Sequence, residues 1–466
     1  MEKIIQQIWD KFLLVGENVI DAIEGEITYP DLEIKVKGIL NELGKDIMKM
    51  GLEAQDAYLV EHREERPSWV IERRQEEKHV VTVFGEMSYR RTYFYNKGTQ
   101  SYAHLADAYA GYTPHLRVDA ATKAVLADMA TEQSYRQSGR GPEQHRWGER
   151  LSGQTVKNTI AGIKAPLRSD DIAAAEKRRE RVLYIEADED HVARRGKKGR
   201  MQIPLVYVHE GKEEASLGRN RLRNARYFSG PYKSIDDLWF AVLDYIENQY
   251  EPDQIERIYI NGDGAAWIRS GTEIIPKSIF VLDRFHLSKY IVAAVGPEPN
   301  LQAAIWEHIE RSDIEKVMAV LDNAQKLRPE REKAITKTRR YIQRQWDGIE
   351  ARNRYREEVQ GCSAEGHVSH ILSARLSNRP GGWSKAGAEQ MAGLRAAKAN
   401  GINIQEIYLA QQPQPVKVLQ IDTEKLKQAK RTIQKNVAAE MIRNMPILNG
   451  PQSLLTKALR ALAATA

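Results

Sequence analysis

The stretch "LYIEADEDHVARRGKKGR", residues 183–200, opens as an apolar strand and then becomes densely charged. Acidic residues occupy positions 188 to 190, and five of the seven positions from 194 to 200 are basic. Carboxylates rarely enter a buried strand unless they are paired or bind a cation. The pattern therefore predicts an acidic site at the end of this strand, beside a loop that holds a negatively charged partner.

The whole chain has 466 residues, too many for one ordinary core, so we expect several domains. Lysine and arginine total 70 against 64 acidic residues, which gives a formal charge of +6. This excess is modest, but it is clustered along the sequence. Clustered positive charge indicates a polyanionic partner.

Cys362 is the only cysteine, which excludes an intrachain disulfide framework and a cysteine zinc finger and fits a reducing compartment. No apolar run approaches the length of a membrane span, and the first residues lack the pattern of a signal peptide. We therefore expect a cytoplasmic protein with no membrane partner.

The N-terminal third divides into two predicted regions. Residues 1–75 have the apolar spacing of helices, and residues 76–170 form a second region that opens with a β-hairpin. In "KHVVTVFGEMSYRRTYFYN", residues 78–96, two β-rich runs flank Gly85-Glu86, which we expect to form the turn. The hairpin is either a structural ribbon or a nucleic-acid contact.

A capped helix is predicted within "LSGQTVKNTIAGIK", residues 151–164. Ser152 is a favoured N-cap residue, and Val156, Ile160 and Ile163 supply an apolar face. Four polar residues would point outward near the helix start: Gln154, Thr155, Lys157 and Asn158. A helix-turn-helix protein presents side chains to base edges from this position, although an ordinary capped surface helix has the same pattern.

In residues 180–290 the spacing of the apolar residues changes between that of strands and that of helices, and it predicts elements in the order β-β-β-α-β-α-β. A meander followed by alternating strands and helices predicts an α/β fold with a mixed sheet whose central strands are parallel. Residues 291–358 have only a helical pattern, residues 359–410 return to the core, and residues 411–466 form a linker and a basic helical tail.

Asp188 ends the first predicted strand of this region and Asp263 ends the fourth. If those strands are parallel neighbours, both carboxylates lie at one edge of the sheet. Glu365, in the first turn of a later helix, is the candidate third acid. Such a set suits two Mg²⁺ or Mn²⁺ ions, which clamp the oxygens of a phosphoryl displacement. Asp190 lies on the same strand face as Asp188 and is the alternative ligand, and Glu365 is alternatively a first-turn acid favoured by the helix dipole.

Four blocks of sequence resemble the Lre-type insertion-sequence transposases, long carried as an uncharacterised bacterial protein family. They are "YIEADEDHVA", "YINGDGAAWI", "VLDRFHLSKY" and "CSAEGHVSHILSARLSNRPGGWS", the last followed by "M", "LRA" and "NG". The similarity runs from the hairpin near residue 80 to Gly401. It implies a ribonuclease H-like catalytic core with an all-helical insertion, as in the related Mutator-type enzymes. From the sequence pattern, we expect the N-terminal part to be a helical, helix-turn-helix-like DNA-binding region.

The resemblance implies that Asp188, Asp263 and Glu365 form an Asp-Asp-Glu triad. His286, with Asp283, resembles the Asp-or-Cys, two residues, His element of those enzymes and would orient the substrate. The partners would be double-stranded DNA, at the element's ends and at the target, and at least one further copy of the chain; the protein would then associate with the nucleoid. Further candidate DNA-binding residues are Arg194, Arg195, Lys197, Lys198, Arg200, Arg375 and Arg379.

Two other functions stay open at this point. A related nuclease would cut DNA without joining strands. A regulator derived from a transposase would bind DNA without cutting it. The sequence favours an enzyme that does both, because all three candidate acids are present.

Overall fold

The computed structural model describes residues 2–140, 151–164, 176–196, 198–216, 219–378 and 381–412. The chain divides into two compact units. Residues 1–50, 78–89 and 116–412 belong to the first unit, and the described part of the second comprises residues 51–77 and 90–115. Within the described residues, no helix is both long enough and apolar enough to cross a membrane.

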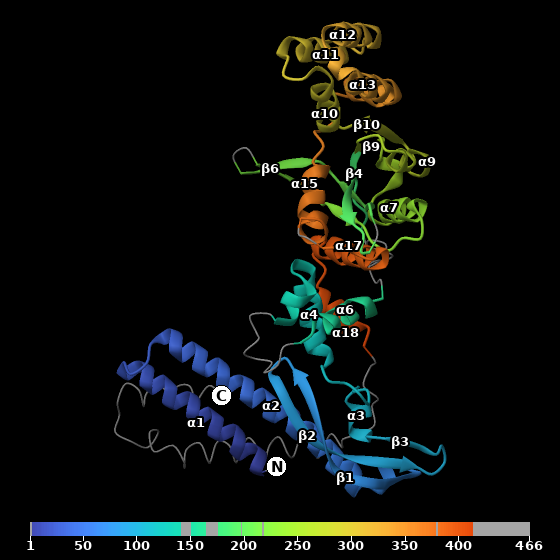
Figure 1. Cartoon of the computed structure of the whole chain (residues 1–466). Helices are drawn as coiled ribbons and strands as arrows, with labels where there is room; N and C mark the ends of the chain where they lie inside the picture. Colours follow the sequence, from blue (N-terminus) through green and yellow to red (C-terminus); the bar gives the residue numbers. More distant parts are fainter. Residues whose placement is uncertain are drawn as a thin grey trace. The chain divides into compact units, whose positions relative to one another are not determined.

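Helices α1 (Glu2–Glu24) and α2 (Tyr29–Glu61) precede the short η1 (Arg63–Glu65) and a three-stranded antiparallel ribbon (Figure 1). The strands of the ribbon are β1 (Trp69–Thr82), β2 (Gly85–Asn96) and β3 (Ser101–Ala103). The predicted hairpin is present, but its turn lies at positions 83–84, and Gly85 already begins the second strand. The first strand also starts at Trp69, inside the region expected to be helical up to residue 75.

The second unit has a small core of its own, formed by Leu59, Phe94, Leu105 and Ala106. Helix α3 (Leu105–Tyr109) supplies the last two. A buried carboxylate ties the end of α2 to β2: Asp56 Oδ1 accepts a hydrogen bond of 2.9 Å from the Thr92 amide.

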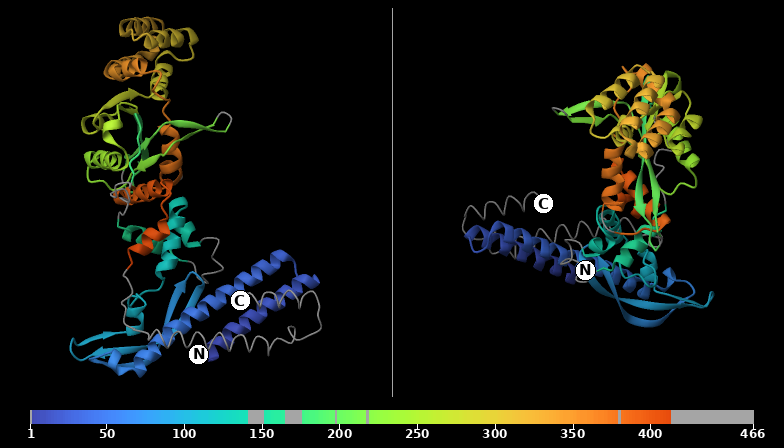
Figure 2. Two further views of the ribbon diagram at one scale, coloured as in Figure 1. Left: turned by 180° about the vertical axis from the view of Figure 1, so that it is seen from behind. Right: turned by 45° about the horizontal axis from the view of Figure 1, so that its top comes forward.

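The first unit is built on a five-stranded mixed sheet with the order β10-β9-β4-β5-β8. The strands are β4 (Val182–Ala193), β5 (Arg200–His209), β8 (Arg226–Phe228), β9 (Arg257–Gly262) and β10 (Ser278–Leu282). β4, β9 and β10 run parallel, and β5 and β8 complete the sheet through antiparallel pairing. The predicted mixed sheet with parallel central strands is confirmed. Between β5 and β8 the chain adds an unpredicted two-stranded arm, β6 (Lys212–Ser216) and β7 (Arg219–Leu222), which projects from the sheet (Figure 2).

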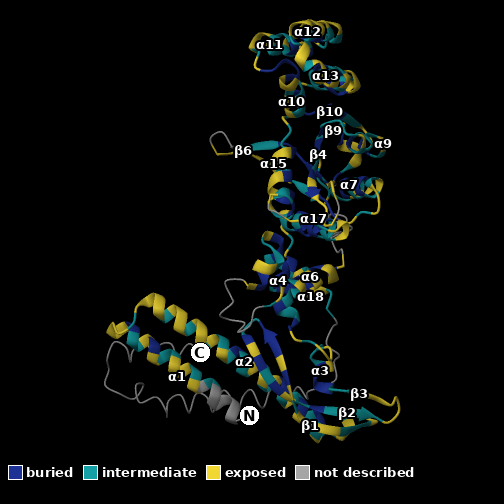
Figure 3. Cartoon of the chain, in the orientation of Figure 1, coloured by how far each residue is buried: buried dark blue, intermediate teal, exposed yellow. Residues whose placement is uncertain are grey.

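Alternation along β4 explains why this strand is central. Leu183, Ile185 and Ala187 point to one face and are fully buried against α7 (Ile235–Gln249), which Ser234 caps with a capping box. Helices α8 (Ala266–Arg269) and α9 (Gly271–Ile274) cover the same face. The strands at the centre of the sheet are accordingly dark blue in Figure 3, where buried residues take that colour.

The predicted helical insertion is present. It begins with α10 (Arg284–Val295), which Asp283 caps, so the expected strand ends at Leu282 and the residues after Asp283 are helical. The other helices are α11 (Pro299–Glu310), α12 (Ile314–Leu327), η3 (Pro329–Arg331), α13 (Glu332–Arg344) and α14 (Trp346–Arg354). Figure 1 shows α11, α12 and α13 clustered beyond the end of the sheet.

The opposite face of the sheet is covered by the segment after the insertion. Its elements are α15 (Ala364–Val368), the π-helical turn η4 (Ser369–Ser373), α16 (Ala374–Leu376), α17 (Lys385–Ala399) and α18 (Ile404–Ala410). They share a core with the helices α4 (Ala120–Glu132), α5 (Tyr135–Arg140) and α6 (Gly153–Gly162). The basic tail predicted after residue 412, together with Lys197 and Arg379, lies outside the described residues.

Candidate active site

One face of β4 carries a row of three carboxylates. Glu186, Asp188 and Asp190 occupy every second position of β4, so all three point to the same face of the sheet, toward the segment 361–377. Contrary to the prediction, Asp188 does not end its strand. Pairing with β9 stops at Glu186, but pairing with β5 continues through Ala193, which leaves Asp188 beside an open edge.

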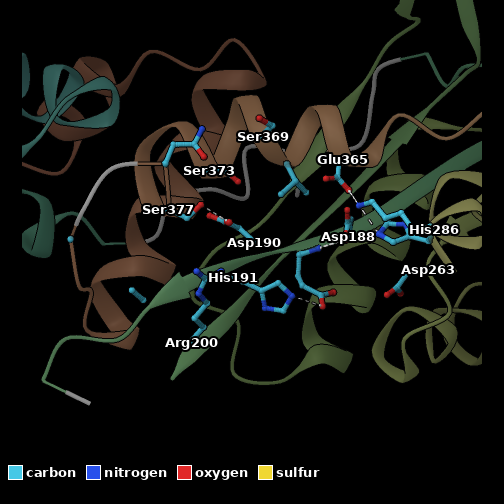
Figure 4. Close-up of a pocket in the computed structure, with 16 residues that line it drawn as sticks. Asp188, Asp190, His191, Arg200, Asp263, His286, Glu365, Ser369, Ser373 and Ser377 are labelled. Carbon is cyan, nitrogen blue, oxygen red and sulfur yellow. Dashed lines mark hydrogen bonds and ion pairs between the residues drawn. The ribbon is translucent and has the colours of Figure 1, made fainter. Parts of the chain in front are cut away.

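Asp188 meets two residues from distant parts of the chain. One ligand atom from each of Asp188, His286 and Glu365 lies within 4.8 Å of the others. His286 is on the first turn of α10 and Glu365 on the first turn of α15, and their Nε2 and Oε2 atoms are 3.9 Å apart. Figure 4 shows the three side chains converging.

Asp263 directly follows β9 and faces the same pocket, which has a volume of about 850 Å³. Its Oδ1 accepts a hydrogen bond of 2.7 Å from the Ala265 amide, and its carbonyl accepts one of 2.7 Å from the Tyr341 hydroxyl. The aspartate is therefore held from both sides. The sequence prediction placed Asp188, Asp263 and Glu365 at one site, and the structure brings all three to one pocket.

The electrostatics of this pocket call for a cation. Burial raises the pKa of Asp188 to about 6, and the nearby carboxylates Glu189 and Asp263 add to the rise. A hydrogen bond of 2.8 Å to Asp283 raises the pKa of His286, and Asp188 and Asp263 also raise it. Lys289, 3.4 Å from Glu365, supplies some positive charge.

The donor set fits a hard divalent ion. Carboxylate oxygens are the ligands that Mg²⁺ and Mn²⁺ prefer, and Asp188, Asp263 and Glu365 offer them at one pocket. His286 belongs to the same cluster: its Nδ1 is hydrogen-bonded to Asp283, which leaves Nε2 facing the carboxylates, 3.9 Å from Glu365 Oε2.

Asp190, the alternative ligand, lies on the same wall but is 5% exposed, and its Oδ1 accepts a hydrogen bond of 2.7 Å from Ser377. Its other oxygen is buried with no partner among the described residues. Because Asp190 is outside the cluster of Asp188, His286 and Glu365, the geometry favours Asp188.

No pattern in the sequence pointed to the role of Glu186, which is 1% exposed. Its Oε2 accepts hydrogen bonds of 2.5 Å from the Ser363 amide and 3.0 Å from the Ser363 hydroxyl. Tyr207 donates to the same oxygen, and His209 lies 3.2 Å from the other. Glu186 thus anchors the residue that precedes α15, two positions before Glu365. The buried acids on either side of Asp188, Glu186 and Asp190, both hold the segment that carries the third acid.

The π-helical turn after α15 lines the pocket through Ser369 and Ser373. Such turns are rare and are frequent at functional sites. Beyond it, Ser377 reaches Asp190. The π-helical turn therefore lies between Ser363, which Glu186 holds, and Ser377, which binds Asp190.

The described cations of the basic loop, Arg194, Arg195, Lys198 and Arg200, are all exposed. None makes an ion pair among the described residues, and Arg200 lines the pocket that holds Asp188, Asp263 and Glu365. Arg195 shares a second pocket, of about 270 Å³, with Lys157 and Arg375. Arg375, a predicted DNA-binding residue, is less available for contact with DNA than expected, because its side chain is already engaged within the chain. Its guanidinium packs over the rings of Tyr135 and Trp383 and donates 2.8 Å to the Ala130 carbonyl.

Helix α6 begins as the sequence predicts, with Ser152 Oγ accepting 3.0 Å from the Thr155 amide. Gln154, Lys157 and Asn158 are exposed, and the Gln154 side chain donates 2.6 Å to Asn158. Thr155 is half-buried, and its hydroxyl lies 3.0 Å from that of Ser152 within the cap. Three of the four predicted outward residues therefore reach the surface.

Comparison with known proteins adds the family. A UPF0236 protein of Caldanaerobacter subterraneus subsp. tengcongensis is 38% identical over 447 residues, which cover 95% of this chain and 93% of the relative. Another from the same genome is 37% identical over 448 residues, and its name joins eleven loci, as expected of a multi-copy gene. A UPF0236 protein of Streptococcus gallolyticus, named for the vanSb 3′ region, is 26% identical over 80% of this chain and 83% of its own length.

Among solved structures, the Drosophila P element transposase strand transfer complex aligns with 71% of this chain and 90% of its own, at 12% identity. The TM-score of 0.18 is too low for that alignment to bear on the fold. The family model described as "Uncharacterised protein family (UPF0236)" matches residues 23–413. On this match and the curated relatives, the chain belongs to the UPF0236 family.

Proposed function

We propose that this protein is the DNA transposase of an insertion sequence, which cleaves the element's terminal inverted repeats and transfers the strand to target DNA. One observation carries the proposal. Asp188, Asp263 and Glu365 come from β4, the end of β9 and α15, and face one pocket that the exposed cation Arg200 also lines. The multi-copy relatives are in keeping with a mobile element.

The sheet supports the proposed fold. Strand β4 is central, with two strands in antiparallel pairing on one side and two parallel strands on the other, and the third acid follows an all-helical insertion. This arrangement fits the ribonuclease H-like core that the sequence resemblance implies. The exposed face of α6, which carries Gln154, Lys157 and Asn158, would read the element's ends, and paired ends require at least two copies of the chain.

Asp188, Asp263 and Glu365 would hold two Mg²⁺ or Mn²⁺ ions, which supply charge stabilisation and an activated nucleophile in phosphoryl displacement. The remaining work belongs to the chain. His286, whose pKa is raised by the hydrogen bond to Asp283 and by its acidic neighbours, would donate a hydrogen bond to a non-bridging phosphate oxygen. Arg200 would neutralise the backbone where it enters the pocket.

Incubation of the full chain with labelled DNA carrying the inverted repeats, Mg²⁺ and a target plasmid tests this function. We expect nicked ends and products joined to the plasmid. Nicking without joined products would identify a nuclease instead. Binding that is equal with and without Mg²⁺, and never followed by nicking, would identify a DNA-binding regulator.

Neutralising the basic loop should flatten the salt dependence of DNA binding. Because a cation that binds a DNA phosphate releases counterions, removing one such cation lowers the slope of log K against log salt by about 0.9. The variant Arg194→Gln, Arg195→Gln, Lys197→Gln, Lys198→Gln should therefore bind all sequences more weakly and with a shallower slope, measured by fluorescence anisotropy.

A matched control changes four cations that already have acidic partners: Lys45 with Glu42, Arg221 with Glu213, Arg311 with Glu307 and Lys316 with Asp313. Their joint replacement by glutamine should alter the slope less. An equal change in both variants would show that the loop does not touch the DNA backbone.

Sequence preference should depend on α6. Side chains that make good bidentate contacts with bases contribute about 1–3 kcal/mol of discrimination each. Gln154→Ala with Asn158→Ala in the full chain should therefore reduce the preference for the element's ends more than the total affinity. The full chain is needed because α6 packs in the core shared with α17. An unchanged footprint on the terminal repeats would place recognition elsewhere.

A further inference from the structure

A further pocket, of about 300 Å³ and distinct from the one beside Arg195, opens within the helical insertion. Helices α10, α11 and α14 form its walls together with the end of β10. The residues used below that line it are Arg284, Leu287, Trp306, Glu310, Arg352 and Arg356. This pocket shares no lining residue with the catalytic pocket.

The lining is strongly cationic, with three arginines against one glutamate. Arg284 packs its guanidinium over the Trp306 ring, 4.6 Å from the ring centre, which fixes its position. Its contact with Glu310 is a distant 3.9 Å, and both of those side chains are more than half exposed. Arg356 contacts only the exposed Glu357, at 3.6 Å, among the described residues. Exposed pairs of this kind contribute little and do not cancel the positive charge of the pocket.

Arg352 is the decisive residue. Its guanidinium is half-buried and makes no hydrogen bond or ion pair among the described residues. Burial lowers the pKa of Arg352 below its usual value and repulsion from Arg284 lowers it further, while the carboxylates of Asp283 and Glu310 offset only part of this effect and form no ion pair with Arg352. Asn353, the polar neighbour in α14, is already committed to the Ile309 carbonyl at 2.6 Å. A half-buried cation beside a second cation is destabilising unless an anion compensates both.

Helix α10 relates this pocket to the catalytic one. Arg284 and Leu287 line the new pocket, whereas His286 and Lys289 line the catalytic pocket. At 3.6 residues per turn, residues three apart share a helix face and these two pairs point in opposite directions. A strand held at the catalytic pocket that continues across the first turn of α10 would bring a further phosphate to Arg284.

We propose that this pocket binds a phosphate group, held between Arg284 and Arg352. Planar guanidinium groups pair with phosphate oxygens through two parallel hydrogen bonds, which makes arginine the favoured residue for such recognition. The phosphate comes either from the backbone of bound DNA or from free phosphate in solution. The site goes beyond the proposed function, because binding here needs neither divalent metal nor strand cleavage.

The test uses the full chain without divalent metal, as wild type and as Arg352→Gln. Removing an unpaired half-buried charge should leave the melting temperature unchanged or higher, while phosphate binding is lost. In the first arm, inorganic phosphate should raise the melting temperature of the wild type above that in chloride of equal ionic strength, and should not raise that of the variant. In the second arm, the salt slope for duplex DNA should fall by about 0.9 in the variant.

Arg339→Gln is the matched control. It removes the same charge from α13 of the same insertion, but Arg339 is paired with Asp322 and lines neither pocket. It should lose stability slightly and keep both responses. If Arg352→Gln differs from the wild type only in its response to inorganic phosphate, the ligand of the pocket is free phosphate. If it differs only in the salt slope for duplex DNA, the ligand is a phosphate of the DNA backbone.

The proposal is overturned if Arg352→Gln keeps the wild-type response to inorganic phosphate and also changes the salt slope no more than Arg339→Gln does. If Arg352→Gln fails to fold, Arg352→Lys serves in its place, because it keeps the charge and loses the paired hydrogen bonds. Its response to phosphate should be weaker than that of the wild type, and an equal response overturns the proposal. Because both arms measure binding without metal, they remain informative whether or not the protein cleaves DNA.

Discussion

DNA cleavage should be roughly a thousandfold slower in each of three single variants, Asp188→Ala, Asp263→Ala and Glu365→Ala. Each variant removes a carboxylate on which metal-assisted phosphoryl displacement depends. Folding and end binding should stay near wild type, since a metal-free pocket is relieved of like charge when one acid is removed. Single-turnover cleavage of labelled end DNA, together with anisotropy titrations, gives both quantities.

The matched control is Glu406→Ala. Glu406 is an exposed acid in the first turn of α18, as Glu365 is in α15, so it reproduces the helix-dipole role without the pocket. This variant should cleave normally. Near-normal cleavage by Glu365→Ala would remove Glu365 from the site. Normal cleavage by Asp188→Ala with loss in Asp190→Asn would move the first ligand two residues along the strand.

Glu186→Gln should reduce the rate of cleavage about a hundredfold, although Glu186 itself does not contact the substrate. The substitution should displace Glu365, and a displacement of about 1 Å in a catalytic group has an effect of this size. Glu186 holds the amide and hydroxyl of Ser363, and that residue fixes the start of the helix that bears Glu365. The amide of glutamine cannot accept all the hydrogen bonds that the carboxylate accepts. The rate at saturating DNA should fall while the dissociation constant for DNA is unchanged.

The same variant has a signature in stability against pH. Burial works to raise the pKa of Glu186, but the hydrogen bond to His209 and the charges of His209 and Lys212 outweigh it and lower the pKa to about 2. A depressed pKa contributes stability above the usual pKa of glutamate, and that contribution is lost as the pH falls toward 2. The difference in unfolding free energy between wild type and Glu186→Gln should therefore narrow below about pH 4.5, as followed by urea unfolding.

Glu210→Gln separates positioning from general destabilisation. Glu210 is also a buried acid beside the central sheet, paired with Arg178 at 3.1 Å and bonded to Tyr250, but its hydrogen bonds and ion pairs among the described residues do not reach the segment that carries Glu365. Both variants should lose stability at neutral pH, and only Glu186→Gln should cleave more slowly. Equal losses of rate in the two would show that Glu186 acts through stability alone.

Local patterns in the sequence determined much of this protein. The apolar alternation around Leu183, the helical spacing of residues 235–249 and the cap at Ser152 each depend on neighbours within a few positions. Such short-range preferences can be predicted from the sequence alone, because strand alternation and helix capping are properties of neighbouring residues in the chain. The mixed sheet and the helical character of residues 291–358 could therefore be predicted, whereas the choice of Glu365 as the third acid also needed the family resemblance.

The tertiary structure alone decided how those acids are used. The sequence shows Glu186, Asp188 and Asp190 as equivalent members of one strand face, yet one binds Ser363, one meets Glu365 and one binds Ser377. The interaction with Ser363 spans 177 positions of sequence. Partners at such separations follow from strand register and from how a distant segment packs, which no local pattern encodes. The unpaired charge of Arg352 likewise could not be predicted from the sequence, since only the packing of the helices shows that none of the described residues forms an ion pair with it.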